Sequence, residues 1–373
     1  MKNGTTTQRE TKNRKGSGRM LAGVFTVLVA TMFFFSGCEK PEPPKPDPVD
    51  PTETAASGVY VLCEGLMDLN NTTLTFYNFL TNDLDNNYFL TQNGRGLGDT
   101  GNDLQTYGSK LYCVVNNSET LEIMDLKSAK SLKQIPLSGK QPRRIAFADG
   151  YAYVCCFNGE VVKVDTASMS VTATAQAGSN PDGICTANGK LYVANSGGLN
   201  YPNYGNTVTV FDLASFTAIK EIPVVINPTR MASDSQGDVY LVSNGNYGSV
   251  PMTFQRIDSQ TDEVVQTFDF AVTNFAICGD LCYFYHYNYN TQQYTLKVMN
   301  VLTEQIVNEQ FVADGTTLHT PYGIAVNPEN GDVYLTDAYQ YTTNGDVYCF
   351  GSDGHKKFSF EAGINPSCIV FLQ

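Results

Sequence analysis

A short motif centred on tyrosine recurs seven times along the chain, and this repetition constrains the fold more than any other feature. In each copy the tyrosine lies among apolar residues, as in KLYCV around Tyr112 and KLYVA around Tyr192. The tyrosines are Tyr60, Tyr112, Tyr153, Tyr192, Tyr240, Tyr283 and Tyr334. Their spacing of roughly 40–50 residues is the period of a propeller, in which each repeat folds into one blade. The sequence therefore predicts seven blades.

The fourth copy shows the pattern of a single blade most clearly. Gly183–Ala187 alternates in polarity and leads into Asn188-Gly189, a pair typical of a tight hairpin turn. Three further strands are expected at Lys190–Asn195, Thr207–Asp212 and Thr217–Val224. One blade is therefore expected to contain four antiparallel strands.

Two other columns of residues keep the same register in the other copies. The third strand of most copies ends in a short polar residue suited to a tight turn. These ends are Asn78, Asp125, Asp165, Asp212, Asp258, Asn300 and, as a glycine, Gly351. A proline also marks the start of several blades, in Gln141-Pro142, Asn180-Pro181, Asn227-Pro228, Thr320-Pro321 and Asn365-Pro366. An irregular β-sandwich would not produce these aligned columns.

The two ends of the repeat region complement each other. The first copy, from Gly58 onward, lacks an innermost strand, whereas Asn365–Leu372 reads as an innermost strand with nothing after it. Pairing these segments completes the first blade and leaves no open sheet edge. We therefore predict an all-β fold, a seven-bladed β-propeller over residues 58–373, whose first blade is closed by the C-terminal strand.

The residues before the repeats read as a targeting segment and a spacer. Basic residues precede the apolar run Met20–Phe35, which is more typical of a signal peptide than of a short transmembrane helix. Residues 1–37 end in Phe35-Ser36-Gly37 before Cys38, a pattern similar to a bacterial lipobox with Cys38 as the lipidated residue. Residues 38–57 are rich in proline, which favours an extended stalk, although an unstructured leader is the alternative.

Charge and cysteine content exclude some functions. The net charge of -13 argues against nucleic-acid binding, which needs a basic face. Nine cysteines follow Cys38, an odd number, and nearly all lie in expected strands, where a thiol acts as a small apolar side chain. Only Cys278 and Cys282 flank a turn at which they would form a local disulfide. No spacing suggests a zinc site, so we expect no metal.

Long loops on one face of the predicted propeller are the expected binding site. Four neighbouring blades carry loops rich in tyrosine, asparagine and glycine, at Ser196–Asn206, Ser243–Met252, Tyr285–Tyr294 and Asp337–Asp346. Such a face suits a large, uncharged ligand rich in amides or hydroxyls. The candidate ligand-binding residues in these loops are Tyr201, Asn203, Tyr204, Tyr247, Tyr287, Tyr289, Tyr339 and Tyr341. Arg143, Arg230 and Tyr322 follow the prolines at blade starts and are expected at the channel mouth.

Catalytic chemistry has little support in the sequence. None of His286, His319 and His355 is placed near a serine or cysteine by a recognisable spacing. A calcium-dependent lactonase would need acidic and amide ligands converging on the channel, for which Glu64, Asn102, Asn195 and Asp337 are the candidates. We expect no catalytic residues and no cofactor, with the lactonase kept as an alternative.

Several segments resemble the cobalamin-capturing surface lipoproteins of the BtuG type. The similar segments are Gly98–Lys130, Lys190–Leu213 and Pro321–Ala338, together with the lipobox, stalk and seven repeats. The resemblance implies a lipid-anchored protein of a Gram-negative outer membrane, facing the cell exterior. It also implies capture of vitamin B12 (cobalamin or a related corrinoid) and delivery to an outer-membrane TonB-dependent transporter. Alternatives on the same scaffold are a glycan, a protein partner without a small ligand, or an anionic siderophore. The cations available to a siderophore are Arg95, Arg143, Arg144 and Arg230.

Overall fold

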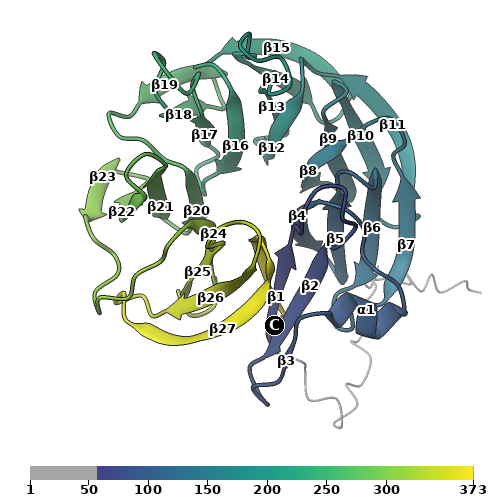
Figure 1. Ribbon diagram of the computed structural model, residues 1–373. Coiled ribbons are helices and arrows are strands. Elements are labelled where there is room, and N and C mark those ends of the chain that lie inside the picture. The colour runs from purple at the N-terminus through teal and green to yellow at the C-terminus, as the bar shows by residue number, and fades with distance from the viewer. Residues whose placement is uncertain (1–56, 373) are drawn as a thin grey trace, which may run out of the picture. The chain divides into compact units, whose positions relative to one another are not determined.

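In the computed structural model, which describes residues 57–372, the chain forms seven antiparallel sheets of four strands each. Figure 1 shows the sheets side by side around one axis, each with one edge strand innermost. Each inner strand contacts the inner strands of both neighbouring sheets, so the ring is continuous. The predicted seven-bladed β-propeller is confirmed. The predicted signal peptide, Cys38 and the stalk through residue 56 lie outside the described residues.

The inner strands, and likewise the second strands, have similar lengths from blade to blade. The inner strands are β4 (Gly101–Tyr107), β8 (Pro142–Ala148), β12 (Pro181–Ala187), β16 (Pro228–Ser233), β20 (Asn274–Cys278), β24 (Pro321–Val326) and β28 (Pro366–Leu372). The second strands are β1 (Gly58–Cys63), β5 (Lys110–Val115), β9 (Tyr151–Cys156), β13 (Lys190–Asn195), β17 (Val239–Ser243), β21 (Leu281–Asn288) and β25 (Val333–Asp337).

The outer half of each blade is formed by its third and fourth strands. The third strands are β2 (Thr73–Asn78), β6 (Thr120–Asp125), β10 (Glu160–Asp165), β14 (Thr207–Asp212), β18 (Thr253–Asp258), β22 (Gln293–Asn300) and β26 (Asn344–Phe350). The outermost strands are β3 (Leu84–Asp85), β7 (Ser131–Pro136), β11 (Ser170–Gln176), β15 (Thr217–Pro223), β19 (Glu263–Thr267), β23 (Gln305–Asn308) and β27 (Lys356–Ile364). Helix α1 (Tyr88–Asn93) follows the two-residue β3.

The predicted closure of the ring is confirmed. Strand β28 pairs antiparallel with β1, with Gly58 opposite Leu372 and Tyr60 opposite Val370. The first and last strands of the described residues therefore share one blade, and they lie side by side in Figure 1. Without β28, the inner edge of the buried strand β1 would have no partner.

Two local expectations differ from the structure. The segment Tyr285–Tyr294 is mostly strand rather than loop, because β21 continues to Asn288 and β22 starts at Gln293. Tyr285 and Tyr287 alternate onto the core side, and this alternation extends the hairpin. Helix α1 was not predicted, since its six residues are too few to show a helical period. Its buried Phe89 packs in the same cluster as Tyr60.

The second-strand tyrosines connect successive blades. All seven are at most 5% exposed. The Tyr60 hydroxyl donates to the Leu126 carbonyl, 3.0 Å away, in the turn after the third strand of the next blade. Tyr192 donates to Asp262 Oδ1 at 2.5 Å and Tyr240 to the Val301 carbonyl at 3.3 Å, each again in the following blade. These tyrosines therefore hold neighbouring sheets at one level.

The cysteines behave as core side chains. The nine cysteines of residues 57–372 are free thiols, and seven of them are buried. Cys278 and Cys282 are not joined across their turn. Within the same residues, no helix combines the length and the apolar character needed to cross a membrane.

The interblade hydrogen bond of Tyr192 predicts a measurable difference between two tyrosines of the same column. We expect Tyr192→Phe to lower the free energy of unfolding by roughly 1–3 kcal/mol, because the carboxylate of Asp262 loses a buried donor. Tyr112→Phe is the matched control, since the buried Tyr112 hydroxyl has no hydrogen-bond partner among the described residues. Urea unfolding of both variants measures the difference. Equal losses would show that these hydroxyls do not join the blades.

Candidate functional site

A β-bulge near the start of the inner strand recurs around the ring. The pairing register between inner and second strands shifts near the start of β4, β8, β12, β16, β24 and β28, but not in β20. The residue just before the strand often has a left-handed backbone, as in Asn180 with φ 45° and Asn227 with φ 62°. A bulge redirects side chains locally. The bulged positions include Asn102, Arg143, Asp182, Thr229 and Tyr322.

These strand starts surround a cavity of about 530 Å³, which we call the mouth cavity. Its lining from inner strands includes Arg143, Arg144, Asp182, Thr229, Arg230 and Tyr322. Its lining from second strands and loops includes Asn244, Tyr247, Met252, Tyr285 and Tyr289. The cavity therefore combines guanidinium groups at the inner strands with aromatic rings from the loops.

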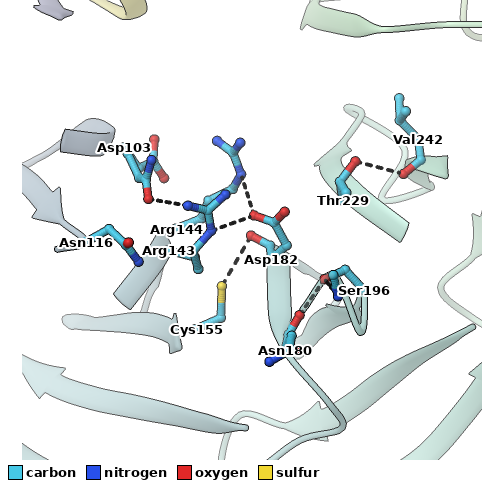
Figure 2. Close-up of polar contacts among 12 residues, drawn as sticks. Asp103, Asn116, Arg143, Arg144, Cys155, Asn180, Asp182, Ser196, Thr229 and Val242 are labelled. Carbon is cyan, nitrogen blue, oxygen red and sulfur yellow. Dashed lines mark hydrogen bonds and ion pairs between the residues drawn. The ribbon is translucent and has the colours of Figure 1, made fainter. Parts of the chain in front are cut away.

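Two of the arginines share one carboxylate. Arg143 Nε donates to Asp182 Oδ1 at 3.1 Å, and Arg144 Nε lies 3.8 Å from the same oxygen. Figure 2 shows both guanidinium groups directed toward Asp182. Burial alone would raise the pKa of the Asp182 carboxyl, but the charges of Arg143 and Arg144 outweigh it and hold the pKa below its ordinary value.

Further contacts fix the orientation of Arg143. Its Nη1 donates to the side-chain oxygen of Asn102, on the neighbouring inner strand. Its guanidinium carbon lies 4.4 Å from the centre of the Phe157 ring, in a cation–π arrangement. Arg143 therefore bridges three consecutive blades, through Asn102, its own strand β8, and Asp182.

The opposite side of the mouth cavity is held by tyrosine hydroxyls. Tyr322 donates to Glu64 Oε2 at 2.8 Å, across the junction between the last and first blades. Tyr285 in turn donates to the Tyr322 carbonyl at 2.7 Å. Burial raises the pKa of Glu64 against the opposing effects of the Tyr322 hydrogen bond and the nearby arginines. These contacts fix the wall of the cavity.

Several predicted loop tyrosines form a row that leads into the cavity. Tyr201 and Tyr247 are 75% and 70% exposed, and the ring of Tyr204 lies between them at centroid distances of 6.0 and 6.1 Å. Tyr289, 61% exposed, lines the cavity itself, and Tyr341 contacts Tyr322 with centroids 5.8 Å apart. The exposed Asn203 lies in the same loop as Tyr201 and Tyr204.

The structure brings together only part of the predicted set. Arg143, Arg230, Tyr247, Tyr289 and Tyr322 line one cavity. In contrast, Tyr287 is 6% exposed and packs in the core between blades. Tyr287 and Tyr339 border a separate cavity of about 490 Å³ beside His319.

Asp182 lines the cavity but is absent from the predicted set, and Arg144 was considered only for the siderophore alternative. A sequence signal for Asp182 exists, because it follows Pro181 as Arg143 follows Pro142. Arg144 comes next in the chain, where the bulge leaves it on the same wall as Arg143.

The residues considered for calcium are engaged by the protein itself. Asn195 is 1% exposed, and its amide bonds Thr207, Thr209 and the backbone of Gly178. Asp337, fully buried, accepts backbone N–H groups from residues 319, 320 and 339. Within residues 57–372, no group of three or more His, Cys, Asp and Glu side chains is placed to hold a metal ion.

The other end of the channel has a different character. There, a cavity of about 650 Å³ is lined largely by apolar residues from the far halves of the inner strands. They include Leu104, Ile277, Ile324, Val326, Ile369 and Phe371. Charged side chains therefore gather at the end of the channel where the inner strands begin.

Comparison with known proteins identifies the family and the fold. The chain belongs to the family described as domain of unknown function DUF5074, which matches residues 57–371. Among solved structures, it is similar to a quinonprotein alcohol dehydrogenase-like protein from Bacteroides thetaiotaomicron, with 15% identity, 86% of this chain and 79% of that chain covered, and a TM-score of 0.64. It is also similar to hydrazine synthase from Kuenenia stuttgartiensis, with 16% identity, 70% and 85% coverage, and a TM-score of 0.57. At such identities the likeness shows the fold alone. No curated protein matches the chain.

The shared carboxylate predicts a pH-dependent contribution to stability. We expect Asp182→Asn to destabilise the protein at neutral pH by roughly 1.5–3 kcal/mol, because Arg143 loses a charged hydrogen-bond acceptor and Arg144 loses its ion-pair partner. Since the folded pKa of Asp182 is depressed, this contribution is fully present above the unfolded pKa of about 4 and is lost as pH falls through the folded pKa. The difference in stability between wild type and Asp182→Asn should therefore become smaller at acidic pH.

Thermal unfolding from pH 7 down to pH 3 measures this difference. Asp269→Asn is the control, because Asp269 is exposed and makes no hydrogen bond or ion pair with another described residue. A difference that stays constant over the whole range would contradict an ionised Asp182 between the arginines.

Proposed function

We propose that this member of the DUF5074 family captures a corrinoid, cobalamin being the first candidate, across its tyrosine-bearing face and delivers it to an outer-membrane TonB-dependent transporter. One observation carries the proposal. The mouth cavity is continuous with exposed aromatic rings, since Tyr247 and Tyr289 line it and are 70% and 61% exposed. Large exposed aromatic side chains around a preformed cavity are typical of a ligand-binding surface.

The chemistry of a corrinoid suits this face. A corrin ring is broad and carries amide groups around its edge. Tyrosine rings offer apolar area and a hydroxyl with few rotatable bonds, so that little entropy is lost when they are ordered. Asn244 and Thr229 in the lining provide polar groups for amides. The row of Tyr201, Tyr204 and Tyr247 extends the surface beyond the cavity, as a ligand wider than the cavity requires.

We propose binding without turnover, and therefore assign no catalytic residue and no cofactor. Two acidic groups at the mouth are held by neighbouring side chains, Asp182 by Arg143 and Glu64 by Tyr322. Such pairing suits a rigid wall. A site on a closed ring of sheets also loses little conformational freedom when a ligand binds, which favours tight capture.

An anionic siderophore is the second candidate, and the arginines favour it. Arg143, Arg144 and Arg230 line the same cavity, whereas only Asp182 forms an ion pair with any of them among the described residues. A chelate with several negative charges would gain from this concentration of guanidinium groups. The two candidates differ in charge and in visible spectrum, so direct binding separates them.

The tyrosine face predicts which substitutions weaken binding. Wild-type protein mixed with cobalamin should keep the corrinoid absorbance after desalting. Tyr247→Ala and Tyr289→Ala should each weaken binding by roughly tenfold or more, mainly through faster release. Surface-immobilised kinetics measures this. Leu132→Ala is the control, since Leu132 is exposed on the outermost strand β7.

Each alternative result has a distinct meaning. If wild type retains no cobalamin at micromolar concentrations, the corrinoid assignment is wrong, and retention of an anionic siderophore would support the second candidate. If cobalamin binds but both tyrosine variants match Leu132→Ala, the ligand occupies another surface. Tyr339→Ala, in the separate cavity beside His319, shows whether the ligand extends that far.

The proposed location rests on the sequence pattern at Cys38 and on the resemblance described above. We propose that Cys38 carries the lipid and that the protein lies on the outer membrane, facing the cell exterior. Cys38→Ala should release the protein from the membrane fraction, as judged by fractionation and immunoblotting. Retention of a Cys38→Ala protein whose signal peptide has been removed would place the anchor elsewhere.

A further inference from the structure

Arg230 differs from the other arginines of the mouth cavity. It follows the bulged Thr229 on β16, and its half-buried side chain lines the cavity. Its guanidinium forms neither a hydrogen bond nor an ion pair with any residue among those described. A guanidinium has five N–H donors, and in a recessed position these groups are normally matched by acceptors.

The surroundings of Arg230 disfavour its charge. Burial lowers the pKa of Arg230, and the positive charge of Arg144 lowers it further. Arg144 is itself poorly satisfied, because its Nε is buried without a hydrogen bond among the described residues and lies 3.8 Å from Asp182 Oδ1. The charges of Asp182 and Asp103 nevertheless raise the pKa of Arg144, so Arg230 is the guanidinium left without a compensating carboxylate.

The acidic side chains near Arg230 already interact with other groups. Asp182 is shared by Arg143 and Arg144. Glu64 accepts the hydroxyl of Tyr322. Asp103 accepts the backbone N–H groups of residues 104 and 145, each at 3.0 Å. None of these carboxylates lies within ion-pair distance of Arg230, so the positive charge at the cavity wall is not cancelled by the described chain.

We propose that Arg230, together with Arg144, binds an oxyanion in the mouth cavity, a phosphate or carboxylate group of the captured ligand. This inference rests on the proposed function only in taking the mouth cavity as the ligand site. The guanidinium fork matches the geometry of either group, and two charge-assisted hydrogen bonds to it would fix the orientation of the ligand. Tyr247 and Tyr289 would then contact the remainder of the ligand.

The source of the oxyanion depends on the ligand. Cobalamin carries one negatively charged group of this kind, the phosphodiester of its nucleotide loop. Cobinamide is a corrinoid without that loop. Comparing the two ligands therefore tests whether the phosphodiester occupies the Arg230 site, while inorganic phosphate tests the site without any corrinoid.

The experiment uses calorimetric titration of the full propeller with inorganic phosphate at low salt, followed by cobalamin and cobinamide. Arg230→Gln should weaken phosphate binding roughly ten- to hundredfold, the effect of losing hydrogen bonds to a charged group. Arg230→Lys should recover part of it, since lysine keeps the charge without the fork. Lys133→Gln, at an exposed site on β7, removes the same charge and should change nothing.

A loss of phosphate binding in Arg230→Gln should not result from misfolding. Because Arg230 donates to no described acceptor, Arg230→Gln leaves no orphaned partner, and the variant should melt no lower than wild type. Equal phosphate binding by wild type and Arg230→Gln overturns the proposal, as does the absence of wild-type binding at millimolar phosphate.

The corrinoid titrations identify the source and separate this inference from the proposed function. Loss of cobalamin affinity in Arg230→Gln, with cobinamide affinity unchanged, supports the phosphodiester as the occupant. Equal losses for both corrinoids refute the phosphodiester. If phosphate binds through Arg230 but neither corrinoid binds, the corrinoid function is wrong and the oxyanion site stands.

Discussion

Contact between neighbouring blades through the second-strand tyrosines is the interaction on which the rest of the structure depends. These rings are buried, and the hydroxyls of Tyr60, Tyr192 and Tyr240 reach into the third-strand turn of the following blade. A hydroxyl that must meet one particular turn fixes the height of one sheet against the next. These bonds form at three of the seven junctions, and contacts between neighbouring inner strands at every junction complete the alignment of the blades. The channel mouth is a consequence of that alignment.

The β-bulge near the start of the inner strand places side chains of different chemistry at equivalent points of the channel mouth. The bulge is a backbone feature, supported by a left-handed residue and often a proline, and so it leaves the side chain that follows free to differ between blades. Asn102, Arg143 and Asp182 occupy the same bulged position in three consecutive blades, and they join into one hydrogen-bonded chain. A repeated backbone thus presents different chemistry at equivalent points, on strands that packing already holds rigid.

The sequence predicted most of the fold because each blade is specified by short, local patterns of apolar residues and turn residues. Six of the seven third strands end at the predicted residue, and β26 ends one residue before Gly351. The site was predicted less completely. Proline placed Arg143 at the mouth, but the pairing with Asp182 exists only after two blades are packed together. Tyr287 was predicted to lie in a loop. In the structure it lies in β21, and the alternation of side chains along this strand places its ring in the core. A composition rich in tyrosine and asparagine does not reveal which face each ring will occupy.

The two ends of the channel show what folding itself requires. At the far end the same inner strands line the second cavity largely with apolar residues, including Leu104, Ile277, Ile324 and Phe371. Nothing in the architecture calls for arginine at the other end, and burying a guanidinium without an acceptor opposes folding. The net charge of the chain is -13, yet this one cavity concentrates three arginines around a single paired carboxylate. The positive charge left at Arg230 is the observation on which the proposed oxyanion site rests, because folding alone gives no reason for it.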